Sequence, residues 1–220
     1  MSQRVLFEIE DDDPELTADD RDFVARLNEL VQRPADDSVH GEAFHDDEDD
    51  LLIGAVSLFD PEENLHLAAM GVYVGDGRVR GDRFDQNYEF RPAPTPFAMD
   101  VTGDRDELVR STAEWFTNVL QRPIVLYVWL HDRYAYAARY LFADTGETLC
   151  QSYSPRFAPP GQEKRLVEEG HVYGKGWIQT TGLPDPSLYL HIRGDLERAA
   201  LPSGVPKATE RAGLPRPWYE

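Results

Sequence analysis

Apolar residues recur at helical spacing in two segments of the chain. Each segment follows a side chain that can cap a helix N-terminus, Thr17 in the first and Asp104 in the second, and a proline ends each run. The pattern predicts helices over 17–33 and 104–121. The apolar positions are Phe23, Val24, Leu27, Leu30 and Val31 in the first, and Leu108, Thr112, Trp115, Phe116, Val119 and Leu120 in the second.

The stretch 124–130 is continuously apolar, which is typical of a strand covered on both faces. Two further strand patterns follow it after short polar turns, so we expect an antiparallel meander over 124–153. Shorter strands are predicted over 4–10, 51–59, 65–74, 97–101 and, with a turn, 172–181. In 4–10, alternation places Val5, Phe7 and Ile9 on the buried face. In the second strand of the meander, it places Tyr134, Tyr136, Tyr140 and Phe142 on one face, which is core or, together with Tyr127 and Trp129, an aromatic ligand-stacking face.

The remaining segments give weaker patterns. Residues 34–50 lack periodicity and are rich in acid, which predicts a mobile loop. A short helix is expected from about 159 to 169, where Gly170 can end it, and a last helix over 186–200. Together these elements predict one α+β domain over 1–200. Its mixed, mainly antiparallel sheet would be centred on 124–153 with the two main helices packed on it, and an irregular tail, 201–220, would follow.

The charge of the chain is concentrated near its N-terminus. Residues 1–63 hold 21 Asp and Glu against 4 Arg, a net of −17, whereas residues 64–220 hold 20 acids against 18 bases, a net of −2. A halophilic protein would spread acid over its whole surface. The acid is therefore a regional feature of the segment 11–63, and its simplest role is solubility.

Several classes of function are disfavoured. No run of about 18 apolar residues is present, so we expect no membrane span, and nothing resembles a signal peptide. The single cysteine, Cys150, forms no internal disulfide, and the histidines lack the spacing of a metal site. No Lys/Arg cluster favours direct nucleic-acid binding. We expect a cytoplasmic protein without metal or cofactor, and its oligomeric state stays open.

One short motif suggests catalysis. The sequence Leu141-Phe142-Ala143-Asp144-Thr145-Gly146 resembles the active-site turn of aspartic proteases, in which two aspartates share a proton. Only one Asp-Thr-Gly occurs, so the resemblance implies a homodimer, and a tight hairpin turn uses the same residues. Cys150 with His131 or His171 as base is a further nucleophile candidate. A small hydrolase with a site near Asp144 is thus one alternative, although no catalytic residue is assigned.

The acidic segment favours binding of a basic protein. A strongly negative face speeds association with a positive partner and can imitate a phosphate backbone, as small acidic immunity proteins do. We therefore expect a non-enzymatic inhibitor, of immunity or antitoxin type, that neutralises a toxin or nucleic-acid-binding protein. A second alternative is an accessory or structural assembly protein of a mobile element, which assembles through its tail. The predicted partner-binding residues are Asp19, Asp20, Asp22, Asp46, Asp47, Glu48, Asp49 and Asp50.

Overall fold

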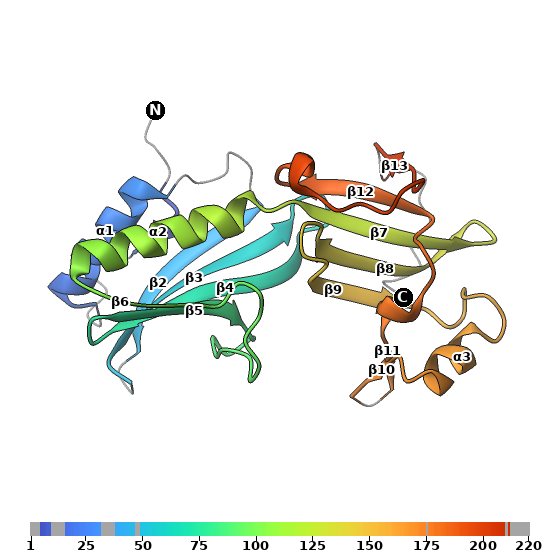
Figure 1. Ribbon diagram of the computed structural model, residues 1–220, viewed down its shortest axis with the longest axis horizontal. Coiled ribbons are helices and arrows are strands. Elements are labelled where there is room, and N and C mark those ends of the chain that lie inside the picture. Colours follow the sequence, from blue (N-terminus) through green and yellow to red (C-terminus); the bar gives the residue numbers. More distant parts are fainter. Residues whose placement is uncertain are drawn as a thin grey trace. The chain divides into compact units, whose positions relative to one another are not determined.

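The computed structural model describes residues 5–9, 16–31, 38–46, 49–174, 176–209 and 211. The chain divides into two compact units, residues 1–121 and 122–220, and each unit has its own sheet (Figure 1). Helices and mixed, mostly antiparallel sheets confirm the α+β class. A single domain over 1–200 stays a prediction, and the two units are described in turn.

The first unit is a six-stranded sheet with two helices. The sheet order is β1-β2-β3-β4-β5-β6, with β1 parallel to β2 and every other pair antiparallel. Helix α2 contacts α1, β5 and β6, so both main helices belong to this unit. The elements are β1 (Phe7–Glu8), α1 (Ala18–Leu30), β2 (Val39–Asp46), β3 (Leu51–Asp60), β4 (Leu65–Gly75), β5 (Arg78–Phe84), β6 (Met99–Thr102) and α2 (Arg105–Gln121).

Both predicted helices begin at their expected caps. The Thr17 side chain accepts a hydrogen bond from the backbone N–H of Asp20, and the Asp20 carboxylate accepts one from the Thr17 N–H, which makes a capping box. In α2 the backbone N–H of Glu107 donates to Asp104 at 2.9 Å. Most of the predicted apolar positions are buried, but Leu30 is exposed because α1 ends there.

Strand β1 is shorter than predicted, and its buried face differs. Leu6 and Phe7 are both buried, whereas Val5 is exposed, so the alternation does not hold at the start of the segment. The Asn28 side chain explains the placement: it accepts from the N–H groups of Leu6 and Phe7 and donates to the Phe7 carbonyl. A polar side chain on α1 thus fixes β1.

The predicted mobile acidic loop over 34–50 is wrong for most of its described part. Residues 39–46 form β2, which pairs with β3 along its whole length. Pairing with the strongly apolar strand β3 supplies hydrogen bonds and burial, and the sequence of β2 by itself gives no sign of either. Residues 32–37 and 47–48 lie outside the described residues.

One face of this sheet carries an aromatic cluster. Ile53, Ala55, Ala69 and Phe84 form its buried base, and Phe44, Tyr73, Tyr88 and Phe90 pack against it. Two of these rings, Tyr88 and Phe90, come from the segment that follows β5. The stretch 78–95, for which no element was predicted, therefore divides into strand β5 and a covering loop.

The second unit has a five-stranded sheet in the order β13-β12-β7-β8-β9, and β12 is parallel to β13 only. The predicted meander is confirmed as β7, β8 and β9. The structure thus has two main sheets where one was expected. The elements are β7 (Ile124–His131), β8 (Tyr134–Phe142), β9 (Thr148–Tyr153), α3 (Gln162–Glu168), β10 (Val172–Tyr173), β11 (Trp177–Ile178), β12 (Leu188–Arg193) and β13 (Lys207–Ala208), with 3₁₀ turns η1 (Thr180–Gly182) and η2 (Leu196–Arg198).

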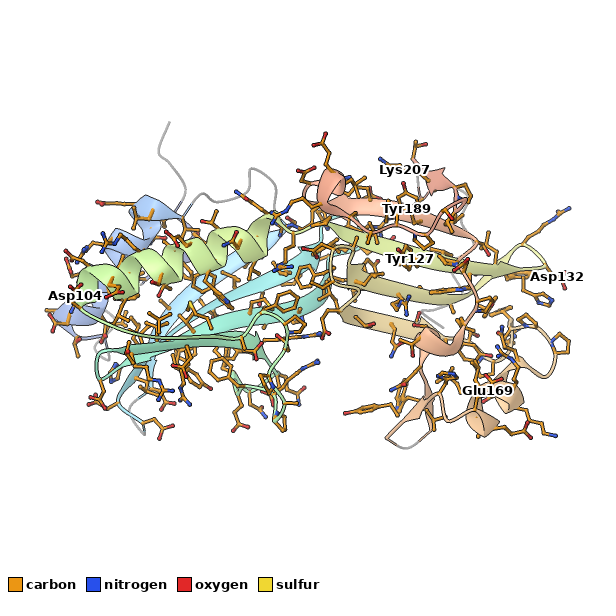
Figure 2. The ribbon with its side chains drawn as sticks, viewed as in Figure 1. Asp104, Tyr127, Asp132, Glu169, Tyr189 and Lys207 are labelled. Atoms are coloured by element: carbon orange, nitrogen blue, oxygen red, sulfur yellow. The ribbon has the colours of Figure 1, made fainter. Side chains whose placement is uncertain are left out.

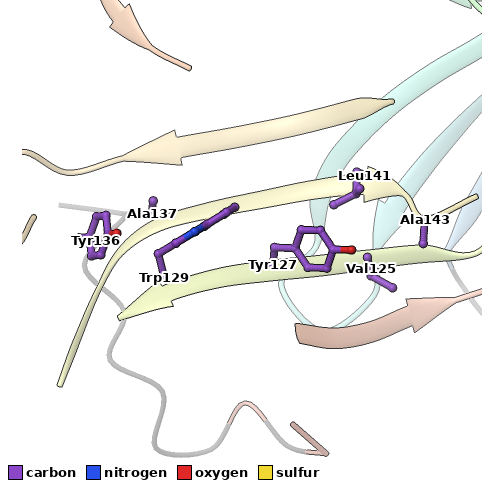
Figure 3. Packing of buried hydrophobic residues seen from close by; sticks show 7 residues of the cluster. All are labelled: Val125, Tyr127, Trp129, Tyr136, Ala137, Leu141 and Ala143. Carbon is purple, nitrogen blue, oxygen red and sulfur yellow. The ribbon is translucent and has the colours of Figure 1, made fainter. Parts of the chain in front are cut away.

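A register shift in β8 changes the predicted aromatic face. Trp129 pairs with Ala137 and Leu130 with Ala135, which leaves Tyr136 as an extra residue on β8. Tyr136 therefore packs in one cluster with Ala137, Tyr127 and Trp129 (Figure 3). The predicted stripe of Tyr134, Tyr136, Tyr140 and Phe142 on one face is thus wrong at Tyr134 and Tyr136. Tyr134 pairs with His131 and Tyr136 packs with Trp129, whereas Tyr140 and Phe142 pair with Leu126 and Ile124, whose side chains lie on the other face.

Two predictions near the C-terminus also need correction. Residues 188–193 form strand β12, not a helix, because Leu188, Leu190 and Ile192 alternate and Gly194 turns the chain with a φ of 78°. The tail is not wholly irregular, since Lys207–Ala208 pairs with β12 as β13. Residues 210 and 212–220, including Trp218 and Tyr219, lie outside the described residues.

Candidate functional site

A cleft of about 410 Å³ in the first unit gathers acidic side chains from distant parts of the sequence. Its rim includes the start of α1, the start of α2 and the turns before β3 and after β4; Figure 2 marks the start of α2 by Asp104. Three predicted partner-binding residues, Asp19, Asp20 and Asp50, line it. The full lining is Thr17, Asp19, Asp20, Phe23, His45, Asp50, Leu52, Val74, Gly75, Asp76, Gly77, Gly103, Arg105 and Leu108.

His45 joins the two acidic edges of the cleft. Its Nδ1 lies 3.2 Å from Oδ2 of Asp20, and its Nε2 lies 3.3 Å from Oδ1 of Asp50. The imidazole is only 9% exposed, whereas the Asp50 side chain is 96% exposed. Asp50 has a positive φ of 53°, a backbone conformation that aspartate tolerates better than most residues. The mostly buried side chain of His45 thus lies between the capping carboxylate of Asp20 on α1 and the solvated carboxylate of Asp50 at the turn.

The acids of α1 are partly neutralised inside the unit. Arg105 Nε lies 3.3 Å from Asp22, and the Arg105 guanidinium also donates to the backbone carbonyl of Asp19. Arg26 lies between Asp22 and Asp106, closest to the latter at 2.5 Å. These ion pairs join α1 to α2. Asp22 therefore supports the helix pair and does not line the cleft.

The other predicted binding residues belong to the end of β2 and the segment between β2 and β3. Asp46 is the last residue of β2, and Asp49 is exposed in the turn before β3. Asp47 and Glu48 lie outside the described residues. The structure brings Asp19, Asp20 and Asp50 together in the lining of the cleft. Asp46 and Asp49 are close to Asp50 in the sequence but do not line the cleft. Whether these residues bind a partner stays a prediction.

The division into units sharpens the charge asymmetry. The first unit has 30 Asp and Glu against 10 Arg, a net of −20, and the second has 11 acids against 12 Lys and Arg, a net of +1. All of the net negative charge thus belongs to the unit that contains the cleft. Salt screens the field of this charge over a Debye length of roughly 8 Å at physiological ionic strength.

Three cleft residues had no role in the sequence analysis. His45, Asp76 and Arg105 were not among the predicted partner-binding residues. One signal did point to Asp76: Gly75-Asp76-Gly77 predicts a tight turn, and Asp76 and Gly77 both have positive φ, 49° and 68°. The position of that turn beside the helix starts follows from the sheet order, which no local pattern encodes.

Three candidate catalytic residues of the second unit, His131, Cys150 and Asp144, do not converge. His131 pairs with Tyr134 and Cys150 with Tyr140 on β8, so they lie six residues apart along that strand, roughly 20 Å. Asp144 follows the far end of β8 and accepts a 2.6 Å hydrogen bond from Arg122. A carboxylate held by a guanidinium differs from the proton-sharing pair of aspartic proteases.

No group of three or more His, Cys, Asp or Glu side chains among the described residues is placed to hold a metal ion. No helix in the described ranges is long and apolar enough to span a membrane.

Comparison with known proteins adds no assignment. No family model, no curated protein and no solved structure matches the chain.

Proposed function

We propose that this protein is a non-enzymatic binding protein that neutralises a basic protein, in the manner of an immunity protein or antitoxin, in the cytoplasm. The observation that carries the proposal is the cleft of the first unit. Asp19, Asp20 and Asp50 come from two separate segments and line it together, in a unit with a net charge of −20. The partner is a toxin or a nucleic-acid-binding protein with a positive surface.

The cleft has the chemistry to accept a lysine or arginine side chain. Asp50 is almost fully solvated, so its carboxylate is accessible to an incoming cation while its Oδ1 lies beside His45. An exposed ion pair contributes only about 0–1 kcal/mol, so no single pair explains tight binding. The summed field of the unit raises the association rate, and several simultaneous pairs around a cleft add specificity.

The alternatives have less support in the geometry. A hydrolase centred on Asp144 would need His131 or Cys150 nearby, and both lie at other places along the sheet. Half of the tail 201–220 lies outside the described residues, and β13 shows another part of that tail pairing within its own sheet.

The proposal is tested by affinity capture with the full chain at low salt. We expect retention of a basic protein that elutes as salt is raised, because exposed charge pairs are screened. The variant Asp49→Asn/Asp50→Asn should lose much of this retention. Its control, Glu62→Gln/Glu63→Gln, removes the same charge from the turn at the opposite end of β3 and should retain the partner. If the wild-type chain captures no basic protein at low salt, the proposed function is wrong.

A further inference from the structure

A row of polar side chains crosses the whole sheet of the second unit. In register order, Lys207 on β13 pairs with Tyr189 on β12, Tyr189 with Tyr127 on β7, Tyr127 with Arg139 on β8, and Arg139 with Gln151 on β9. Residues directly opposite one another on neighbouring strands project from the same face. Figure 2 shows three members of this row, Lys207, Tyr189 and Tyr127, in succession across the strands.

Arg139 is held against two aromatic rings. Its guanidinium carbon lies 5.7 Å from the centre of the Tyr127 ring and 5.5 Å from that of Trp129. The two rings are perpendicular to one another, and the Trp129 indole N–H is anchored on the Pro184 carbonyl at 2.7 Å. The rings thus hold the arginine at a fixed place on the sheet.

The Arg139 charge has no counter-charge in the described part of the chain. No Asp or Glu there forms an ion pair with it, and its Nε is buried without a hydrogen-bond partner. Burial lowers the pKa of the Arg139 guanidinium, and only the nearby Tyr127 opposes this shift. By contrast, Arg122 in the same unit binds Asp144. A half-buried cation without an anion is unfavourable unless something else supplies the negative charge.

The side-chain oxygen of Gln151, which pairs with Arg139 across the strands, already accepts hydrogen bonds from another residue. Oε1 of Gln151 accepts hydrogen bonds from both the backbone N–H and the hydroxyl of Thr180, at 2.9 and 2.7 Å. In the described residues, the Tyr127 and Tyr189 hydroxyls and the Lys207 ammonium make no hydrogen bond or ion pair either. Burial raises the pKa of Tyr127, so its hydroxyl stays a donor at neutral pH. The row therefore offers donors and two cations, with no acid among them.

We propose that this row is a binding site for the oxyanion of a small ligand, a carboxylate or a phosphate, with Arg139 as its anchor. The planar guanidinium matches the two oxygens of either group, and the Tyr127 hydroxyl adds a donor on the neighbouring strand. Lys207 lies three strand spacings from Arg139, roughly 14 Å, and attracts the anion without contacting the same group. This site is independent of the acidic cleft and of the partner proposed for it.

The test is an NMR titration of the full isotope-labelled chain with inorganic phosphate and, separately, with sodium acetate, at constant ionic strength. The Arg139 Nε–H and Trp129 indole resonances are followed. We expect saturable shifts at both for at least one anion; saturation with phosphate alone assigns a phosphoryl ligand, and saturation with acetate alone a carboxylate. Shifts that grow linearly without saturation for both anions would overturn the proposal.

Substitutions of Arg139 distinguish an anion-binding role from a purely structural contact with the Tyr127 and Trp129 rings. Arg139→Met keeps the apolar stem and should abolish the saturable shift of the Trp129 indole, and Arg139→Lys, which keeps the charge but not the fork, should weaken binding several-fold. The control is Arg156→Met, because Arg156 also lies over an aromatic ring, that of Phe157 at 5.1 Å, but is exposed. This control should bind as the wild type does. Equal indole titrations in wild type and both Arg139 variants would contradict the assignment.

Discussion

The hydroxyl of Tyr88 donates a 2.7 Å hydrogen bond to Oε1 of Glu42. Tyr88 belongs to the loop after β5, whereas Glu42 lies on β2, three strands away in the same sheet. The Tyr88 carbonyl in turn accepts from the Tyr73 hydroxyl. These bonds hold the loop over the aromatic cluster, so a segment with no periodicity of its own becomes part of the first unit's core.

This bond predicts a loss of stability at high pH. The hydrogen bond to Glu42, followed by burial, raises the pKa of Tyr88 from 10.0 to about 12. Because the folded pKa is raised, the contribution to stability is complete below pH 10 and is lost as pH rises toward 12. Urea unfolding as a function of pH should show this decline, and Tyr88→Phe should make the curve flatter. An unchanged slope in that variant would contradict the assignment.

The same cluster predicts a strict requirement for glycine at position 71. A Cβ on Gly71 would overlap the buried ring of Phe84. Gly71→Ala should therefore lower the free energy of unfolding by about 1–3 kcal/mol, as overpacking does. Gly54→Ala is the matched control on the adjacent strand, where the nearest atom, Cγ2 of Val72, would lie at an ordinary 3.4 Å. Denaturant titration of both variants decides the matter, and equal losses would refute the overlap.

The capping box of α1 predicts a smaller effect. Thr17→Ala removes the acceptor for the Asp20 N–H and should cost about 1 kcal/mol of unfolding free energy. Thr17→Ser keeps that acceptor and should restore most of the loss. Chemical denaturation measures both. If alanine and serine destabilise equally, the hydroxyl is not the stabilising group.

The Arg122–Asp144 pair predicts a measurable coupling. Both side chains are mostly buried, at 21% and 14% exposure, and their atoms approach to 2.6 Å. A double-mutant cycle with Arg122→Met and Asp144→Asn should give a coupling energy of about 1–3 kcal/mol. If the losses of unfolding free energy in the two single variants simply add, the pair does not stabilise the fold, and a catalytic role for Asp144 would have to be considered again.

The elements that the sequence predicts best are those with local signals. Helices α1 and α2 begin at Thr17 and Asp104 because a capping side chain and an apolar face act within one turn. The meander over 124–153 is also local, since its turns are short. Strand β2 escapes prediction because its inward positions are Val39, Gly41, Ala43 and His45, of which only Val39 is a large apolar residue.

The site depends on relationships that no local pattern contains. Asp20 and Asp50 are thirty residues apart, and only the fold places His45 between them. The bulge at Tyr136 has a similar origin, because a register shift reassigns a side chain to the other face without any change in composition. The residue types and the regional charge of the site were thus predictable from the sequence, whereas the meeting of Asp20, His45 and Asp50 in one cleft was not.

The most direct test of the acidic-cleft account is the affinity for a captured basic partner as a function of salt. We predict that the dissociation constant of the wild-type chain rises steeply with salt. Asp49→Asn/Asp50→Asn should bind at least tenfold more weakly at low salt, a loss of about 1.4 kcal/mol. The charge-matched Glu62→Gln/Glu63→Gln should stay close to wild type. Equal weakening by the two pairs would show that only net charge matters, and an affinity independent of salt would contradict the account.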